Sequence, residues 1–500
     1  MTNRAPFILL LSLLLLLSTS LVMQASSLPG HLVPIFSAPT GSEPLTHAED
    51  WVSFRGGPSN AASRIFETAT RQKPTEWSFK PSPWTWAYRP GTGVWSSPSI
   101  AQVGERVILF VGSYDNNLYA VDAFSGEELW RFTTGGEIFS TPAVANINGK
   151  HTVFFGSAER ILYALDAETG AKIWAYQLVD WRYTVGESRI SSPAVFSLDG
   201  RDVVLFCWWV HDASFARPLE TTEALLLDCE NGQRVWQARF SKSPPSSPCV
   251  ATIEGQPRIF VSARDGNTYC LDGKSGDLLW KHTSQGEVLS SPSCAAGLDP
   301  PLILVGSRYG ALHALDSRDG SPVWTFKAGH WIDSSPAIVE MAGEPYVLFG
   351  SHDQSVYCLN ARTGRFRWSF PTKGDVYSSP AVFEDGQRTL VAVASGDDYL
   401  YLLDAWSERE VWRDRPGRFL WGYRIVGDSI WSSPVAARLN GHWILFAPFY
   451  DGQVHAYSLG EAKETAKHRS SYGEIMLLKI ASTIVGTLLV IGILFRLGRQ

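Results

Sequence analysis

Short apolar runs separated by polar turns recur along most of the chain. Val107–Val111 and Leu118–Val121, for example, flank the polar turn Ser113–Asn117. Apolar runs of four or five residues bounded by Gly, Asn and Asp are typical of β-strands. The same pattern returns in eight consecutive segments, so the chain is predicted to be all-β and built from repeats.

A proline triplet marks the start of each segment. The triplet Ser-Ser-Pro, or Ser-Thr-Pro in one copy, occurs eight times, and four of its seven spacings are 44 residues. Proline has no N–H group, so it is tolerated at the first residue of a strand, where no ladder hydrogen bond is lost. The triplet is therefore predicted to open the innermost strand of each segment. Its prolines are Pro98, Pro142, Pro193, Pro248, Pro292, Pro336, Pro380 and Pro434.

A second motif, A-x-D-x-x-T/S-G-x-x-x-W in its fullest form, follows each of the first seven triplets. Its Asp is suited to accept hydrogen bonds from backbone two residues on, and its Gly supplies a positive φ, so the motif predicts a tight turn. The Trp lies eight residues after the Asp or Asn in every copy, and its large apolar face is suited to seal one segment against the next. The tryptophans predicted to dock in this way are Trp130, Trp174, Trp236, Trp280, Trp324, Trp368 and Trp412.

Four short strands per 44-residue segment are the signature of a β-propeller blade. The eighth segment stops before its outer strand, because Ser458 and Ala466 stand where the Asp and the Trp are expected. A strand-like stretch at Trp77, near the other end of the chain, supplies the missing strand and an eighth docking tryptophan. The sequence therefore predicts an eight-bladed β-propeller over residues 75–459, with an N-terminal strand that closes blade 8 and leaves no free blade edge.

Loop length varies on one predicted face of the propeller. The interval from Trp to the next Pro is 12 residues in five units, but it is longer before Pro98, Pro193 and Pro434, and blade 3 carries an insert at 209–222. Variable loops on a rigid scaffold are where binding usually occurs, and Trp, Tyr and Arg are enriched at interface hot spots. These residues either form a partner or ligand surface or pack together to shield the central channel. They are Trp84, Trp86, Tyr88, Arg89, Trp181, Arg182, Tyr183, Arg189, Trp209, His211, Arg217, Arg418, Trp421, Tyr423 and Arg424.

Composition argues against a nucleic-acid partner. The chain of 500 residues has a formal net charge of −6, and the body of the chain contains no block of Lys and Arg. Nucleic-acid binding normally needs a clustered basic footprint. The 20 tryptophans need many buried slots, which a repeat architecture supplies.

Both ends of the chain carry apolar segments. Phe7–Val22 follows a basic residue and predicts a secretory signal, which is either cleaved or retained as an anchor. Residues 475–495 are long enough, at about 1.5 Å per residue, to cross a bilayer as a helix, and two arginines follow them. We therefore expect a single-pass membrane protein whose propeller lies outside the cytoplasm. The expected order is signal 1–26, extension 27–74, propeller 75–459, linker 460–474, transmembrane helix 475–495 and cytoplasmic tail 496–500.

The chain offers little catalytic or metal-binding chemistry. Cys270 and Cys358 replace the Ala of the repeat motif, and Cys249 and Cys294 follow the proline triplet. These are strand positions suited to small buried residues, so free thiols are favoured over disulfides. No His and Cys have zinc spacing, and the Asp residues of the turns are predicted to be turn formers. No catalytic residue and no metal ligand is predicted.

The A-x-D-x-x-T-G-x-x-x-W motif resembles the tryptophan-docking motif of the quinoprotein propellers, and Trp51-Val-Ser-Phe-Arg-Gly56 resembles the opening of many BamB-like chains. That family includes dehydrogenases dependent on pyrroloquinoline quinone (PQQ) and Ca²⁺, and non-catalytic relatives. The resemblance implies a vicinal cysteine pair over the cofactor in the dehydrogenases, but no two of the six cysteines here are adjacent. The calcium ligands and the catalytic Asp also find no matching motif. BamB is a lipoprotein without a C-terminal span, so the predicted anchor departs from it as well.

The leading hypothesis is therefore a membrane-anchored, extracytoplasmic propeller that binds a protein partner, with no cofactor. The first alternative is a PQQ-dependent oxidoreductase that uses PQQ and Ca²⁺. A second alternative is a sensor of a small ligand or sugar, because stacked Trp and Arg at a channel mouth suit polar rings. The identity of the partner is left open by the sequence.

Overall fold

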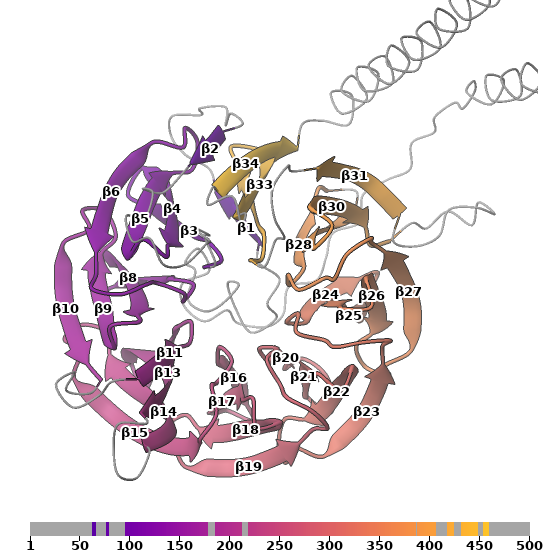
Figure 1. Ribbon diagram of the computed structural model, residues 1–500, viewed down its shortest axis with the longest axis horizontal. Helices are drawn as coiled ribbons and strands as arrows, with labels where there is room; N and C mark the ends of the chain where they lie inside the picture. Colours follow the sequence, from indigo (N-terminus) through magenta and orange to yellow (C-terminus); the bar gives the residue numbers. More distant parts are fainter. Residues whose placement is uncertain are drawn as a thin grey trace, which may run out of the picture. The chain divides into compact units, whose positions relative to one another are not determined.

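The computed structural model describes residues 63–66, 77–79, 96–178, 186–212, 219–386, 388–406, 418–424, 432–448 and 454–459. In this part of the chain every regular element is a β-strand, and the strands form eight separate sheets. The sheets are arranged in a ring as the blades of a propeller (Figure 1), and we call the region around the axis of this ring the channel. The prediction of an eight-bladed β-propeller is confirmed.

Each blade is an antiparallel meander that runs from the channel outwards. Blade 1 consists of β3 (Ser99–Val103), β4 (Arg106–Gly112), β5 (Asn117–Asp122) and β6 (Glu128–Thr133). Blade 2 consists of β7 (Ala143–Ile147), β8 (Lys150–Ser157), β9 (Ile161–Asp166) and β10 (Lys172–Gln177). Blade 3 consists of β12 (Ala194–Leu198), β13 (Arg201–Asp212), β14 (Leu219–Asp228) and β15 (Arg234–Ser241), with β11 (Gly186–Ile190) added. Blade 4 consists of β16 (Cys249–Ile253), β17 (Gln256–Ser262), β18 (Asn267–Asp272) and β19 (Leu278–Thr283).

The other half of the ring follows the same plan. Blade 5 consists of β20 (Ser293–Ala295), β21 (Leu302–Gly306), β22 (Ala311–Asp316) and β23 (Pro322–Lys327). Blade 6 consists of β24 (Ala337–Met341), β25 (Glu344–Ser351), β26 (Ser355–Asn360) and β27 (Phe366–Pro371). Blade 7 consists of β28 (Ala381–Glu384), β29 (Thr389–Ser395), β30 (Tyr399–Asp404) and β31 (Arg418–Arg424). Blade 8 consists of β32 (Val435–Leu439), β33 (His442–Pro448) and β34 (Val454–Leu459), with β1 (Ser63–Phe66) and β2 (Trp77–Phe79) added.

Blade 8 is closed by the N-terminal part of the chain, as predicted. Strand β2 pairs antiparallel with β34, and Trp77 lies opposite Ala456 in the same register as Trp130 opposite Ala120 in blade 1. The structure adds a second strand that the sequence pattern did not predict. Strand β1 pairs in parallel with β32 on the channel side of the blade. The N-terminal region therefore contributes both the innermost and the outermost strand of blade 8.

The hydroxyl groups of the triplets close the ring. The second Ser of a triplet accepts a hydrogen bond from the backbone N–H of the matching residue in the preceding blade, as Ser335 does from Ser291 at 3.0 Å. Seven such bonds of 2.9 to 3.3 Å run around the channel, and the last joins Ser433 of blade 8 to Ser97 of blade 1. The first Ser bonds within its own blade, as Ser334 does to the N–H of Gly350. Both hydroxyls are buried, so each removes an unsatisfied backbone donor from the core.

The docking tryptophans seal the outer seams between blades. The indole N–H of Trp280 donates to the backbone oxygen of Ser317 in the next blade, at 3.0 Å, and five other docking tryptophans make the same bond. Gly320 of that next blade packs against the Trp280 ring and has a φ of +76°. A Cβ atom at this position would lie 2.6 Å from the ring. The Gly of the motif is therefore required both for the turn and for the approach of the tryptophan.

All six cysteines are free and buried, which confirms the prediction of free thiols. Cys249 and Cys270 lie in the core cluster between blades 4 and 5, and burial raises the pKa of each thiol to about 12. They pack as small apolar residues. The predicted signal, linker and C-terminal segment 475–495 lie outside the described residues. Within the described ranges, no helix has the length and apolar character needed to cross a membrane.

The ring hydrogen bond can be tested at Ser335. Ser335→Ala leaves the buried N–H of Ser291 without an acceptor, and we expect it to lower the free energy of unfolding by about 1–3 kcal/mol. Ser335→Thr, which keeps a hydroxyl group at this position, is the matched control. Urea unfolding of the two variants measures the difference. Equal stability of the alanine and threonine variants would show that the hydroxyl ring does not hold the blades.

A second prediction concerns the stability of the propeller in acid. His313 and His282 lie at the seam of blades 4 and 5 with ring centroids 5.7 Å apart, and burial, with the charges of His282 and Lys327, lowers the pKa of His313 to about 4. The unfolded chain protonates at a pKa of about 6.5, so it binds more protons than the folded chain below that pH. Stability should fall by about 3 kcal/mol as the pH decreases from 6.5 through 4, and level off below. His313→Leu, which copies Leu225 of blade 3, should flatten this profile in urea titrations, and an unchanged slope would contradict the assignment.

Candidate functional site

A row of charged side chains lines one mouth of the channel over blades 4 to 7. In each of these blades, the turn between the second and third strands is held to the loop that enters the inner strand. The N–H of Arg308 donates to the oxygen of Glu287, and the N–H of His352 to the oxygen of Trp331. Because these bonds repeat, equivalent side chains of successive blades come to equivalent places around the mouth.

The row breaks the repeat at three kinds of position. One position is in the turn between the second and third strands, directly after the Ser or Ala that ends the second strand. It holds Tyr114, Ala158 and Gly396 in blades 1, 2 and 7, but Arg264, Arg308 and His352 in blades 4, 5 and 6. The residue just before a triplet is apolar or aromatic in the other blades and is acidic at Asp333. Acidic residues three positions before a triplet also join the row. We call the following set the charged row: Arg264, Glu287, Arg308, Asp333, His352 and Asp375.

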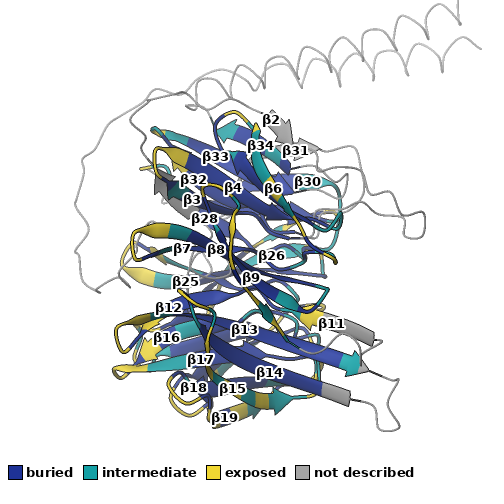
Figure 2. Ribbon diagram, turned by 90° about the vertical axis from the view of Figure 1, so that its left-hand side faces the viewer, coloured by how far each residue is buried: buried dark blue, intermediate teal, exposed yellow. Residues whose placement is uncertain are grey.

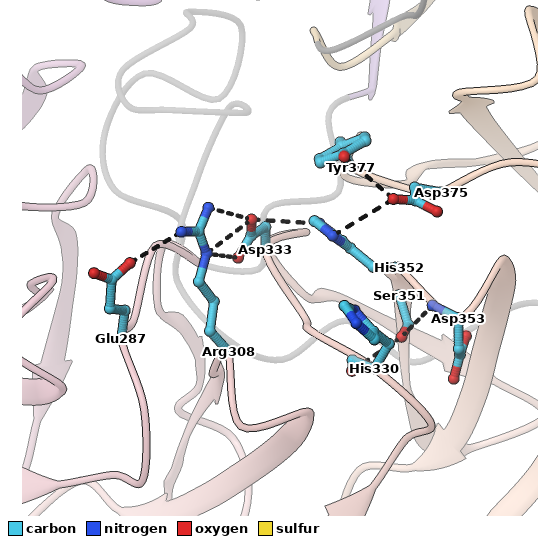
Figure 3. Close-up of polar contacts among 9 residues, drawn as sticks. All are labelled: Glu287, Arg308, His330, Asp333, Ser351, His352, Asp353, Asp375 and Tyr377. Carbon is cyan, nitrogen blue, oxygen red and sulfur yellow. Dashed lines mark hydrogen bonds and ion pairs between the residues drawn. The ribbon is translucent and has the colours of Figure 1, made fainter.

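Arg308 is the centre of the charged row (Figure 3). Its Nε and Nη2 atoms donate to the carboxylate of Asp333 at 3.0 to 3.3 Å, and its Nη1 donates to Glu287 Oε2 at 3.0 Å. Hydrogen bonding to Asp333 raises the pKa of Arg308. Burial acts to raise the pKa of Asp333, but the interactions with His352 and Arg308 outweigh it and lower that pKa below its ordinary value. Both groups therefore stay charged at neutral pH.

His352 continues the charged row from blade 6 to blade 7. Its Nε2 lies 3.3 Å from Asp333 Oδ2, and its Nδ1 lies 3.7 Å from Asp375 Oδ2. The ring is 4 % exposed, and its Nε2, though close to the carboxylate, makes no hydrogen bond within the described part of the chain. The hydroxyl of Tyr377 donates to Asp375 Oδ2 at 3.2 Å, and the Tyr377 ring packs edge-on against His352 at 4.2 Å. The row thus crosses the seams between three blades.

Trp331 is the large apolar side chain beside the charged row. It is 40 % exposed, and the guanidinium of Arg308 lies over its ring at 4.7 Å. His352 also packs against Trp331, with ring centroids 5.5 Å apart. An exposed tryptophan held in one orientation by an arginine and a buried histidine is therefore presented at the mouth.

Two of the predicted loop expansions meet in blade 3. Strand β11 pairs with the extended part of β13, with Arg189 opposite Trp209. The segment predicted as a loop from residue 209 begins as part of this long hairpin, which extends past the neighbouring blades in Figure 2. Trp209 is buried, donates its indole N–H to the oxygen of Lys242 and stacks on His211. Trp209 is therefore a packing residue of the hairpin, whereas Arg189 is exposed.

The candidate residues of blade 7 do not lie in a loop of the mouth. Arg418, Trp421, Tyr423 and Arg424 form the outer strand β31. Trp421 lies opposite Leu402, with the same register shift that places Trp368 opposite Cys358 in blade 6. The structure thus puts Trp421 at the register position that the sequence pattern assigned to Trp412.

The connection that precedes β31 is longer than in the other blades. Strand β30 ends at Asp404 and β31 begins at Arg418, and the sequence has Glu408 where the motif has its Gly. The long stretch of blade 7 therefore lies between Asp404 and β31 rather than before Pro434 alone. Several predicted residues lie outside the described residues. They are Trp84, Trp86, Tyr88, Arg89, Trp181, Arg182, Tyr183, Arg217 and Trp412.

Sequence reasoning missed the charged row because polar residues in turns are usually turn formers. The turn residues Asp265, Asp353 and Asp397 do have that role, since each accepts a hydrogen bond of 2.5 to 2.7 Å from a tyrosine hydroxyl four residues on. The signal that would have found the row is the departure from the repeat. Asp333 is the one acidic residue directly before a triplet in the printed sequence.

The comparisons with known proteins place this architecture in a family. Residues 26–207, 221–328 and 308–459 match the family described as outer membrane protein assembly factor BamB. The chain belongs to this BamB family. No curated protein matched it in sequence.

The solved structures that resemble this BamB-family chain include quinoprotein dehydrogenases. A europium-containing methanol dehydrogenase has a TM-score of 0.58 at 14 % identity, over 80 % of this chain and 90 % of that one. A quinohemoprotein alcohol dehydrogenase from Pseudomonas putida HK5 has a TM-score of 0.60 at 12 % identity, over 83 % and 80 % of the two chains. BamB from Moraxella catarrhalis has a TM-score of 0.49 at 17 % identity, over 72 % and 96 %. At these identities the dehydrogenases share the fold with this chain.

The residues described do not fit the PQQ and metal that the dehydrogenases imply. In the described ranges, no three His, Cys, Asp or Glu side chains converge in a way that could hold a metal ion. The Asp333 carboxylate is engaged by Arg308 and lies 3.3 Å from His352. The six cysteines lie buried in separate strands and turns. We therefore derive no chemical step through that cofactor.

The Arg308–Asp333 pair can be tested by a double-mutant cycle. Asp333→Leu and Arg308→Ala install the residues found at the same positions in blades 5 and 2, Leu289 and Ala158. Asp333→Leu alone should cost about 1–3 kcal/mol of unfolding free energy, because Arg308 keeps only Glu287. The double variant should lose less than the sum of the single losses. Additive losses in urea unfolding would show that the pair does not couple the blades.

Proposed function

We propose that this BamB-family chain is a protein-binding propeller, and that its partner docks on the mouth over blades 4 to 6. The observation that carries the proposal is Trp331. A large exposed aromatic ring beside an arginine is the composition that dominates binding energy at protein interfaces. The proposal moves the predicted binding centre from the loops around Trp421 and Arg424 to Trp331 and Arg308.

The rigidity of the mouth supports this function. The Trp331 backbone accepts a hydrogen bond from His352, and its ring contacts both the Arg308 guanidinium and the His352 ring. A side chain that is already ordered loses little conformational entropy on binding. The surrounding charged row supplies polar groups at the rim, which favours a specific partner.

The ionisation of the mouth favours binding over catalysis. A general base works best with a pKa near the working pH. The lowered pKa of Asp333 and the raised pKa of Arg308 take both groups away from that range. Their hydrogen-bonding atoms are also used on one another. The Arg308–Asp333 pair is therefore arranged as a scaffold of two fixed charges.

The location of the propeller is part of the proposal. The predicted signal 1–26 and transmembrane helix 475–495 would hold the propeller outside the cytoplasm, next to a membrane. The family description, an outer membrane protein assembly factor, supports a partner that takes part in the assembly of membrane proteins.

The test is retention of the partner after purification of the full chain from its own membrane. Trp331→Ala should remove most of the co-purifying partner without unfolding the propeller, because the side chain is exposed. Phe366→Ala is the matched control, since Phe366 is a 51 % exposed aromatic residue on outer strand β27. Loss of the partner in the Phe366 variant with full retention in the Trp331 variant would move the binding face to the rim.

A further inference from the structure

The charged row changes character where it meets blade 3. From Arg308 onwards basic and acidic side chains alternate, as Asp333 lies between Arg308 and His352 (Figure 3). At blade 4 the alternation stops. The loop that enters blade 4 carries Ser243, Pro244 and Pro245, where blades 5 and 7 carry an acidic residue.

Two arginines, Arg189 and Arg264, interact electrostatically at this seam. Arg264 lies in the turn of blade 4, and its N–H donates to the oxygen of Pro244 at 3.1 Å. Arg189 lies at the end of β11, three residues before Ser192. The N–H of Ser192 donates to the hydroxyl of Ser247 at 3.3 Å, which ties the two entry loops together. The backbone therefore brings Arg189 and Arg264 to adjacent places on the mouth.

The two side chains have no acceptor in the described part of the chain. Arg264 is half-buried, Arg189 is exposed, and neither guanidinium makes a side-chain hydrogen bond or ion pair with a described residue. Burial and the charges of Arg189 and Arg308 lower the pKa of Arg264 by more than the charges of Glu287 and Asp333 raise it. By contrast, Arg308 in the next blade is matched by two carboxylates.

We propose that Arg189 and Arg264 form a carboxylate-binding subsite at the seam of blades 3 and 4, and that it receives an acidic segment of the protein partner. The subsite rests on the proposed binding function and names the chemistry of the partner. Guanidinium groups bind carboxylates in a planar, two-pronged geometry, and an anion between two like charges relieves their repulsion. A chain with a net charge of −6 repels acidic partners in general, so this positive site selects where such a segment can bind.

The probe for this subsite is a fluorescein-labelled octaglutamate peptide, added to the full-length chain in detergent and followed by fluorescence anisotropy. An octaglutamine peptide is the neutral probe. We expect octaglutamate to bind more tightly than octaglutamine, and added salt to weaken it. Arg264→Gln and Arg189→Gln should each weaken octaglutamate binding about tenfold, which is the usual effect of one charge-assisted hydrogen bond.

Arg362→Gln is the matched control for the charge. Arg362 is an exposed arginine in the turn after Asn360, at the opposite end of its blade, and has no ion pair with a described residue. Its removal changes the net charge by the same amount and should leave octaglutamate binding unchanged. Equal weakening by Arg362→Gln and Arg264→Gln would overturn the subsite, because it would show that only net charge acts.

Small anions distinguish the source of the carboxylate. If citrate or inorganic phosphate displaces octaglutamate at a concentration well below that of the peptide, the subsite holds a free anion and the proposed acidic segment is wrong. The two proposals can also fail separately. Loss of the partner by Trp331→Ala with unchanged octaglutamate binding in Arg264→Gln overturns the subsite alone. Weakened octaglutamate binding in Arg264→Gln, with the partner retained by Trp331→Ala, overturns the binding face at Trp331 alone.

Discussion

The hydrogen bond between one Ser-Ser-Pro triplet and the next is the constraint on which the rest of this propeller depends. A single blade of four strands cannot bury both of its faces, so each blade needs a neighbour on either side. The triplets provide that contact at the channel, where the chain passes from blade to blade, and the docking tryptophans provide it at the outer seam. The bond from Ser433 to Ser97 joins the last blade to the first.

The closed ring holds the backbone at the mouth of the channel in place, and the side chains at the mouth contribute little to this. The turns that carry Arg308 and His352 are bonded through their backbone to the entry loops that end in the triplets. Side chains at these positions can therefore change from blade to blade without loss of the fold. Blades 4 to 7 use this freedom to place fixed charges and one exposed tryptophan at the mouth, whereas blades 1 and 2 place Tyr114 and Ala158 there.

The fold was accessible from the sequence because its determinants are local and repeated. Each triplet, turn Asp, turn Gly and Trp acts within one blade or its neighbour, so position along the chain predicts position in the ring. Two features were not predicted from the sequence, because they do not follow the repeat. Strand β1 is four residues long and owes its place to pairing with β32, far away in the chain. Trp421 takes the docking register 17 residues after Asp404, and a motif search with a fixed spacing of eight residues does not find it.

The candidate site was less accessible, since a binding residue in a repeat is seen only as an exception to it. Loop length pointed to Arg189, which the structure does place at the mouth, and to Trp209, which it buries. It did not point to Asp333 or Trp331, because the loop that carries them has the ordinary length. The charged row is found when the residues at equivalent positions of the eight blades are compared, rather than the lengths of their loops.

The central claim is that this BamB-family propeller binds a protein through the mouth over blades 3 to 6. The most direct measurement is a cryo-EM structure of the full chain purified together with its partner. The account predicts protein density of the partner against Trp331 and an acidic side chain of the partner between Arg189 and Arg264. Partner density confined to the outer rim or to the opposite face, or a bound quinone in an otherwise uncovered channel, would contradict it.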